Sequence, residues 1–512
     1  MIKNLIETGH GDYLVGMPRF FALFFVLVCS LATAFAKTEW LHARSEHFDV
    51  FSSAGKGSTT DMVEQLEDMY YLFGRLYAQK PNYEVRTLVV YAGNDRDFKP
   101  FRKIYQGKPI EVGCIFMHPI DYPALIMQDG WSSESSRRMI YNGMAMVMVD
   151  ALISDPPLWF STGFASLFET VEVDKKSFTF GAHHEGHVQN MQNRALIPLR
   201  DLIVVSQSSP VYNQGNKRDL FFAESWAFAH MCFLGEDKTM ASKLKTYLAT
   251  ERLERDKVAC MQRAFGESLE SLDRKLQQYT RYGRYRRVEG TMPADRNCKA
   301  DYVPCTTVEL ESARQGLLHR IHNEEQYKNA AIAAYRNLVD TDNELLCSTA
   351  ALHCIAMNES QLGLSLAERA LTLNTRNPKV YQMLLEQETH QMPCTVTYRM
   401  PEEVAARLRA RVDKGLELCP SSVALYNQLA YVEAFAPNFR KEKLSFLQEQ
   451  ANKVADRSQI LVMLAYIRWR YGDPETAKQI LAHLKEEDGL KTPLARELDS
   501  YLTKGKPWKK FL

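Results

Sequence analysis

The sequence lacks the short motifs that mark several common enzyme classes. It contains no Gly-x-Ser-x-Gly, no phosphate-binding loop and no Gly-x-Gly-x-x-Gly. No Cys-x-x-Cys pair occurs, so neither a zinc ribbon nor a thioredoxin-type site is indicated. An excess of one charge is also missing: 63 basic residues oppose 62 acidic ones, for a net charge of +1. This balance gives no electrostatic reason to expect a nucleic-acid partner.

One long hydrophobic run is present, and it lies near the start of the chain. The apolar stretch 20–36 follows Arg19 and ends in Ala34-Phe35-Ala36, a small-x-small site. This layout is typical of a secretory signal peptide over residues 1–36, with Met17 as an alternative start. The run is short for a membrane span, and an uncleaved anchor is the alternative. We therefore expect an exported protein, periplasmic or extracellular, without a membrane span after cleavage.

The rest of the chain divides by its patterns into a mixed half and a helical half. Residues 37–285 mix strand-like and helical stretches: Arg86–Tyr91 reads as a buried strand, and a helix is expected from Ser132 or Ser133 to about Ile153. A hairpin is expected over Val171–Gly181. Residues 286–307 are predicted to be a linker.

Residues 308–512 show only helical periodicity, with signs of a repeat. Leu429-Ala430 recurs as Leu464-Ala465, 35 positions later. A period near 34 residues is typical of tetratricopeptide repeats, whose helix pairs stack because none buries its apolar face alone. The segment His390–Pro401 interrupts the pattern, and an irregular helical bundle is the alternative.

Nine of the ten cysteines lie beyond the leader, an odd number that leaves at least one unpaired. Cys298 and Cys305 flank a short polar loop and are the best local candidates for a disulfide. Cys347 and Cys354 share a helical face, where apolar packing is the simpler interpretation.

Four stretches of the N-terminal half carry a resemblance to a known family. They are RSEHFDVFSSAG at 44–55, PPLWFSTGFASLFETVEV at 156–173, FFAESWAFAHMCFLG at 221–235 and AFGESLESLDRKLQQYTRYGRY at 264–285. The run from Trp40 to about Arg287 resembles exported bacterial proteins with a peptidase-MA-like (gluzincin-like) domain, often followed by tetratricopeptide repeats. The resemblance implies an α+β gluzincin-like domain followed by an all-α helical-repeat solenoid.

In that family a His-Glu-x-x-His helix and a later glutamate hold a catalytic zinc ion, and the resemblance shows where this chain departs from the pattern. Asn142 and Met146 stand at the histidine positions, Gly143 at the general base and Thr162 at the third ligand. An amide, a thioether and a hydroxyl are poor substitutes for zinc ligands, and glycine has no group that accepts a proton. The resemblance thus implies a former zinc site without its metal, and we expect no cofactor.

A second group of potential ligands competes with this interpretation. The stretch His183-His184-Glu185-Gly186-His187 is rich in ligand types but is not His-Glu-x-x-His. It is either a solvated polar loop or a relocated metal site.

Two further polar positions have simpler interpretations. His230 lies on an apolar helix and is expected to be a core histidine with a backbone partner. Ser225, in AESWA, lacks the strained turn that a nucleophile needs, and its neighbour Glu224 is a candidate for a buried, paired carboxyl group.

Three functions remain open. The first is a non-catalytic exported binding or scaffold protein, with a protein or peptide partner on the repeats. The second is an exported metal-dependent hydrolase that uses His183, His184, Glu185 and His187. The third is a structural or regulatory subunit that acts through the repeats alone.

Overall fold

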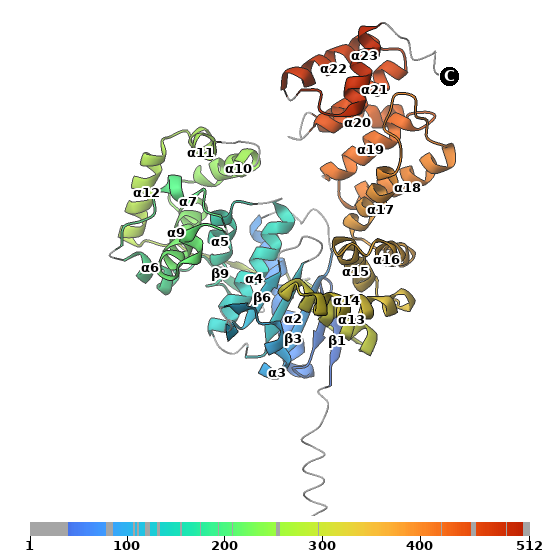
Figure 1. Ribbon diagram of the computed structural model, residues 1–512. Coiled ribbons are helices and arrows are strands. Elements are labelled where there is room, and N and C mark those ends of the chain that lie inside the picture. The colour runs from blue at the N-terminus through green and yellow to red at the C-terminus, as the bar shows by residue number, and fades with distance from the viewer. Residues whose placement is uncertain are drawn as a thin grey trace, which may run out of the picture.

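The computed structural model describes residues 39–504 apart from short gaps, and the expected leader, residues 1–36, lies outside the described residues. The gaps are 78–84, 106–107, 110–111, 118–122, 131–133, 154–155, 175, 193, 207, 252–255, 295, 421, 452–456 and 488. A mixed sheet lies at the centre, a helical lobe lies on one side of it, and a long helical arm extends from the other (Figure 1). The structure is therefore α+β in its first half and helical in its second.

The central sheet has six strands in the order β11-β1-β2-β3-β7-β6. β2, β3 and β7 are parallel, whereas β11, β1 and β6 pair antiparallel with their neighbours. The strands are β1 (Leu41–Arg44), β2 (Phe48–Ser52), β3 (Thr87–Ala92), β6 (Cys114–Met117), β7 (Ala124–Gln128) and β11 (Asp301–Val303).

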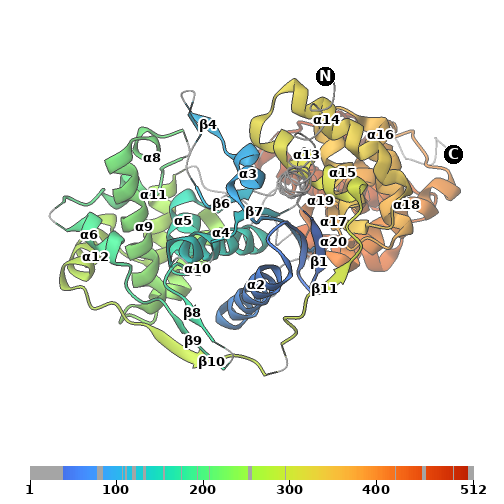
Figure 2. The same cartoon turned by 90° about the horizontal axis from the view of Figure 1, so that it is seen from below.

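Helices cover both faces of this sheet because successive strand residues point to opposite sides. On β3, Val89 and Tyr91 pack with α2 (Lys56–Tyr77) and α4 (Glu134–Leu152). Leu88 and Val90 face the other way, in one apolar cluster with Leu317 on α13 (Thr307–His322). Figure 2 shows α2 and α4 on one side of the strands and α13 on the other.

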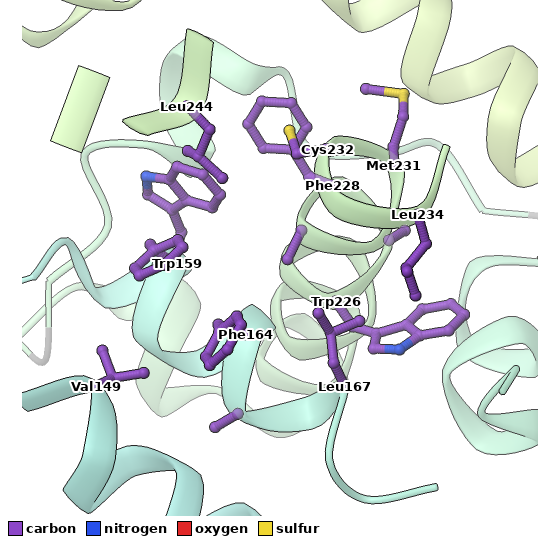
Figure 3. Close-up of a cluster of buried hydrophobic side chains, with 14 of the residues drawn as sticks. Val149, Trp159, Phe164, Leu167, Trp226, Phe228, Met231, Cys232, Leu234 and Leu244 are labelled. Atoms are coloured by element: carbon purple, nitrogen blue, oxygen red, sulfur yellow. The ribbon is translucent and has the colours of Figure 1, made fainter. Parts of the chain in front are cut away.

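The helical lobe is built around two helices that cross in direct contact. α5 (Leu158–Ser166) and α9 (Gly215–Leu234) approach so closely at Gly163 that a Cβ there would lie 2.1 Å from the backbone oxygen of Ser225. Trp159 and Trp226 are fully buried beside this crossing (Figure 3). The other elements of the lobe are β8 (Glu172–Val173), β9 (Ser177–Phe180), α6 (Glu185–Met191), α7 (Leu199–Leu202), α8 (Pro210–Asn213), α10 (Met240–Thr250), α11 (Lys257–Phe265), α12 (Leu269–Tyr282) and β10 (Val288–Thr291).

The structure confirms that His230 is a core histidine with a backbone partner. It is fully buried on α9, and its Nε2 lies 2.8 Å from the backbone oxygen of Gly181. The hydroxyl of Tyr279 lies 2.6 Å from Nδ1, so both ring nitrogens have partners.

The helical arm is a stack of helical hairpins. Helices α13, α15, α17, α19 and α21 contact one another in sequence and form one row, which we call the inner row, and the intervening helices pack against it. Beyond α13 the helices are α14 (Glu325–Arg336), α15 (Glu344–Ala356), α16 (Ser360–Thr372), α17 (Pro378–His390), α18 (Glu402–Leu418), α19 (Val423–Phe435), α20 (Lys441–Ala451), α21 (Ser458–Arg470), α22 (Pro474–Glu487) and α23 (Pro493–Thr503).

The segment 286–307, predicted to be a linker, carries two strands that sequence reasoning missed. β10 pairs with β9 in the helical lobe, and β11 pairs with β1 at the edge of the central sheet. The segment therefore binds the lobe and the sheet together.

The suggested disulfide between Cys298 and Cys305 is wrong, since neither is bonded to the other or to any cysteine in the described part of the chain. They lie at opposite ends of β11, whose extended backbone separates them. A strand rises about 3.3 Å per residue, whereas a disulfide requires Cα atoms within about 7 Å of each other. The Sγ atom of Cys298 instead lies 3.4 Å from Asp68 Oδ1.

Within the described part of the chain, no helix combines the length and the apolar character needed to cross a membrane.

Candidate functional site

The positions that the resemblance assigns to the zinc-binding helix lie on α4, and they face different surroundings. Asn142 is half-buried, and its side-chain amide donates a hydrogen bond of 2.7 Å to Glu169 Oε1. Gly143 faces the edge of the sheet, where a Cβ would lie 3.6 Å from Cys114 Sγ. Met146 packs against the apolar core of the helical lobe. Only Asn142 among these three therefore reaches a polar group.

Thr162, at the third-ligand position, is half-buried on α5. The same segment continues through Ser166 to Glu169, just beyond the end of the helix. Glu169 is the residue that sequence reasoning missed. The sequence offers one signal for it, its place at the end of the Trp159 stretch, but nothing local indicates its partners.

Glu169 is the centre of a hydrogen-bond network that joins three segments. Its Oε1 accepts from Asn142 and, at 2.9 Å, from the hydroxyl of Ser166. Its Oε2 lies 3.1 Å from His184 Nε2 and 4.0 Å from His187 Nε2. The network thus brings together the α4 position Asn142 and two of the four residues of the competing histidine stretch.

The other two residues of the histidine stretch, His183 and Glu185, do not contact Glu169. His183 and Glu185 are exposed, and Glu185 Oε1 accepts a 3.3 Å hydrogen bond from Gln189. The four predicted ligands therefore do not form one group, and Glu169 takes the place of Glu185 in the cluster.

Burial and hydrogen bonding act in opposite directions on Glu169. Burial alone would raise the pKa of this carboxyl group, but the hydrogen bonds from His184 and from the Ser166 hydroxyl hold that pKa below its ordinary value. The carboxylate is thus ionised at neutral pH. His187 behaves differently, because burial lowers its pKa to about 4 and keeps the ring neutral.

The capping role of His184 determines which of its ring nitrogens carries the proton. It is the N-cap of α6, and its Nδ1 accepts a 3.1 Å hydrogen bond from the backbone N–H of His187. A neutral imidazole carries one proton, so an accepting Nδ1 places that proton on Nε2. Nε2 can then donate to Glu169. The Arg138 guanidinium lies 3.5 Å from Nε2, farther than the Glu169 carboxylate at 3.1 Å. The shorter contact with the carboxylate agrees with a proton on Nε2.

These facts bear on whether the cluster fits a metal ion. Ligand atoms of Glu169, His184 and His187 all lie within 4.8 Å of one another, close enough for a common ion. Metal ligation needs a lone pair on His184 Nε2, however, and that nitrogen carries the proton. The two imidazole rings also stack, with centroids 4.0 Å apart and an angle of 28° between their planes, so their in-plane lone pairs run side by side. In this arrangement the donor set does not fit a metal ion.

The helical arm carries a separate hollow of about 590 Å³ on its inner row, which we call the repeat groove. Met392 and Cys394 in its lining belong to residues 391–401, the segment between α17 and α18, which we call the strap. The residues that line the repeat groove are Glu386, Gln387, Thr389, His390, Met392, Cys394, Gln428, Tyr431, Gln459 and Met463.

Comparison of the chain with known protein families and with curated proteins found no match.

Proposed function

We propose that this is a non-catalytic exported binding protein, with a degenerate peptidase-MA-like domain and a tetratricopeptide-like arm that captures a protein or peptide. One observation carries the proposal. Asn142, at the position of the first zinc-binding histidine, donates its amide hydrogen bond to Glu169. The polar group at the former centre is therefore used to hold α4 against the segment after α5. Export to the periplasm or the cell exterior rests on the leader, residues 1–36.

The chemistry of the four replaced positions supports this proposal. Hydrolysis by a zinc peptidase requires a metal-bound water and a carboxylate that removes its proton. Gly143 has no side chain to act as this base, and Met146 is packed among apolar residues. The arm, by contrast, offers an open groove with polar walls.

Metal analysis of the purified mature protein tests the proposal directly. We expect less than about 0.1 equivalent of zinc after purification without chelator, because zinc sites of the structural or catalytic type bind tightly. The same sample should not cleave casein. Stoichiometric zinc together with chelator-sensitive cleavage would contradict the proposal.

Restoring the lost side chains tests the register of the resemblance. We expect the variant Asn142→His, Gly143→Glu, Met146→His and Thr162→Glu to bind about one zinc ion per chain. The backbone has room at Gly143, since the atoms nearest to an added Cβ lie 3.5 Å or more away. The matched control keeps Asn142 and carries the other three changes. Equal zinc content in both, with circular dichroism showing both folded, would show that the register is wrong.

One observation favours a second function, an exported hydrolase with a relocated metal. His187 Nε2 is buried, has no hydrogen-bond partner among the described residues and lies 4.0 Å from the carboxylate of Glu169. A metal ion would satisfy this nitrogen if His184 gave up its capping bond. In that case zinc added to the wild type would bind, Glu169→Gln would abolish binding and His183→Ala would leave it unchanged. If the wild type does not bind added zinc, this second function is excluded.

A further inference from the structure

A strongly basic surface runs from the middle of α12 to the start of β10. Residues 274–288, which we call the basic segment, contain six basic residues and no acidic one. All six side chains are exposed: Arg274, Lys275, Arg281, Arg284, Arg286 and Arg287. The whole chain has a net charge of only +1, so the rest of the sequence is net acidic. The basic segment therefore differs in charge from the remainder of the protein.

Half of these basic side chains make no ion pair within the fold. Arg274, Arg281 and Arg284 form none with another residue that the structure describes. The other three pair with carboxylates, Lys275 with Glu267, Arg286 with Glu236 and Arg287 with Glu289. The helix dipole favours a cation on the last turn of α12, which accounts for Arg281. It does not account for Arg274, about two turns earlier, or for Arg284, which lies beyond the helix.

Two large apolar side chains are exposed in the same segment. Tyr282, on the last turn of α12, is 72% exposed, and Val288, at the start of β10, is 37% exposed. No other large hydrophobic side chain in the described part of the chain is as exposed as Tyr282. Tyrosine is suited to a bilayer interface, where its ring leaves water while its hydroxyl stays hydrated.

Two further tyrosines fix the basic segment to the core of the helical lobe. The hydroxyl of Tyr279 lies 2.6 Å from Nδ1 of the buried His230, and the ring of Tyr285 packs on Trp226 with centroids 4.9 Å apart. Between them, Gly283 ends α12 in the left-handed conformation, with φ of 59°. The backbone that carries the exposed arginines is thus held in place, and a preformed surface lowers the entropy cost of binding.

We propose that the basic segment is a docking surface for a bilayer that contains anionic phospholipids. Arginine stays protonated and donates paired hydrogen bonds to phosphate oxygens. Each Lys or Arg near an anionic bilayer strengthens binding by about five-fold. The exposed apolar side chains add a contribution that salt does not screen. A soluble polyanion would engage the arginines alone, so Tyr282 and Val288 favour a bilayer.

The location of the basic segment permits this docking. Figures 1 and 2 both show α12 at the outer edge of the helical lobe, on the side away from the helical arm. A bilayer would therefore meet the lobe without contacting the arm. The inference goes beyond the proposed function and does not depend on the loss of zinc.

Sedimentation with vesicles tests the inference. The mature protein is mixed with vesicles of phosphatidylcholine alone, or with vesicles in which about one third of the lipid is phosphatidylglycerol. We expect at least ten-fold tighter binding to the anionic vesicles at about 0.1 M salt. Most of this difference should disappear at about 1 M salt, where the Debye length falls from about 10 Å to about 3 Å.

Arg274→Gln, Arg281→Gln and Arg284→Gln combined should lower the affinity for anionic vesicles at least ten-fold. The matched control is Arg336→Gln, Lys441→Gln and Lys504→Gln, which removes three exposed cations of the helical arm that form no ion pair with a described residue. It makes the same change in net charge and should leave the affinity unchanged. Circular dichroism verifies that both variants are folded.

Tyr282→Ser distinguishes a bilayer from a soluble polyanion. It keeps every charge, and we expect it to weaken binding to anionic vesicles several-fold at both salt concentrations. Binding of dextran sulfate, a soluble polyanion, should not change in this variant.

Equal binding of the wild type to neutral and anionic vesicles, or equal losses in the two triple variants, would overturn the inference. Unchanged vesicle binding by Tyr282→Ser would also overturn it and would indicate a soluble polyanion as the partner. None of these results depends on zinc content, so they are distinguishable from failure of the non-catalytic proposal.

Discussion

Glu224 shows how a single buried carboxyl group can affect stability. It lies on α9 with no exposed surface, and its Oε2 accepts a 2.7 Å hydrogen bond from the backbone N–H of Ile197. Its Oε1 has no hydrogen-bond partner among the described residues. Burial raises the pKa of this group from 4.5 to about 8, despite the bond from Ile197. The folded protein therefore favours the protonated carboxyl group.

The pH dependence of stability follows from this raised pKa. The contribution of neutral Glu224 is fully present below pH 4.5 and is lost as the pH rises through about 8. Glu224→Gln keeps the acceptor for Ile197 and does not ionise. We expect it to raise the free energy of unfolding by roughly 2–4 kcal/mol at pH 8 and to have little effect at pH 4. Urea unfolding at both pH values measures this.

Glu185→Gln is the control for Glu224→Gln, since it makes the same change at an exposed position on α6. An equal gain for Glu224→Gln at pH 4 and pH 8 would contradict the assignment.

At the residue scale, sequence reasoning points to three members of the polar cluster around Glu169 and misses its centre. Asn142, His184 and His187 were all named as candidates, but as members of two competing sites. Their common partner, Glu169, was not named, because a single glutamate carries no periodic signal. The contact depends on how α4 and α5 pack in three dimensions, and the spacing of residues along the chain does not report that packing.

At the scale of elements, Gly163 on α5 and Gly143 on α4 differ in the space that an added side chain would have. A Cβ on Gly163 would lie 2.1 Å from the backbone oxygen of Ser225, so α5 and α9 would have to separate. A Cβ on Gly143 would make only ordinary contacts, the nearest at 3.5 Å from Leu125.

We therefore expect Gly163→Ala to lower the free energy of unfolding by about 1–3 kcal/mol, the usual cost of overpacking. Gly143→Ala should leave it unchanged or raise it by up to about 1 kcal/mol, because alanine is the better helix former. Thermal and urea unfolding of both variants give the comparison. Similar losses in the two would show that the close crossing of α5 and α9 is not what constrains Gly163.

Elements with a clear sequence pattern or turn signal were predictable, and the short hairpin expected over Val171–Gly181 is confirmed as β8 and β9. The strand expected at 86–91 is β3, Thr87–Ala92, and the helix expected from 132 or 133 to 153 is α4, Glu134–Leu152. The strand is recognisable as a continuous apolar, β-branched run, and the helix is long enough to show a helical period. β10 and β11 are short, and none of their residues is buried, so their partner strands define them more than their own residues do.

At the scale of the whole molecule, the helical arm and the sheet share a core. One apolar cluster runs from the sheet through α13 to α17, and a second runs from α17 to α23. On α13, Glu309 Oε1 accepts a 2.9 Å hydrogen bond from Asn343 and lies 3.9 Å from the guanidinium of Arg44 on β1. The first hairpins of the arm are thus anchored to the sheet.

This arrangement predicts where the chain tolerates a cut. A fragment beginning at residue 308 leaves the sheet-facing side of α13 exposed, and we expect it to aggregate or to unfold without cooperativity. A fragment beginning at Pro378 keeps the second cluster, and we expect it to unfold cooperatively. Far-ultraviolet circular dichroism with urea titration compares them. A fragment from 308 that unfolds as cooperatively as the one from 378 would contradict a shared core.

The anchoring of α13 on the sheet gives the arm a fixed base. Stacked helical arrays need a terminal cap for the apolar face of the last unit, and here the sheet fills that place at one end. The arm can therefore gain units at its far end without disturbing the domain that carries it. A partner held on the inner row would therefore lie in a fixed direction from the Glu169 cluster.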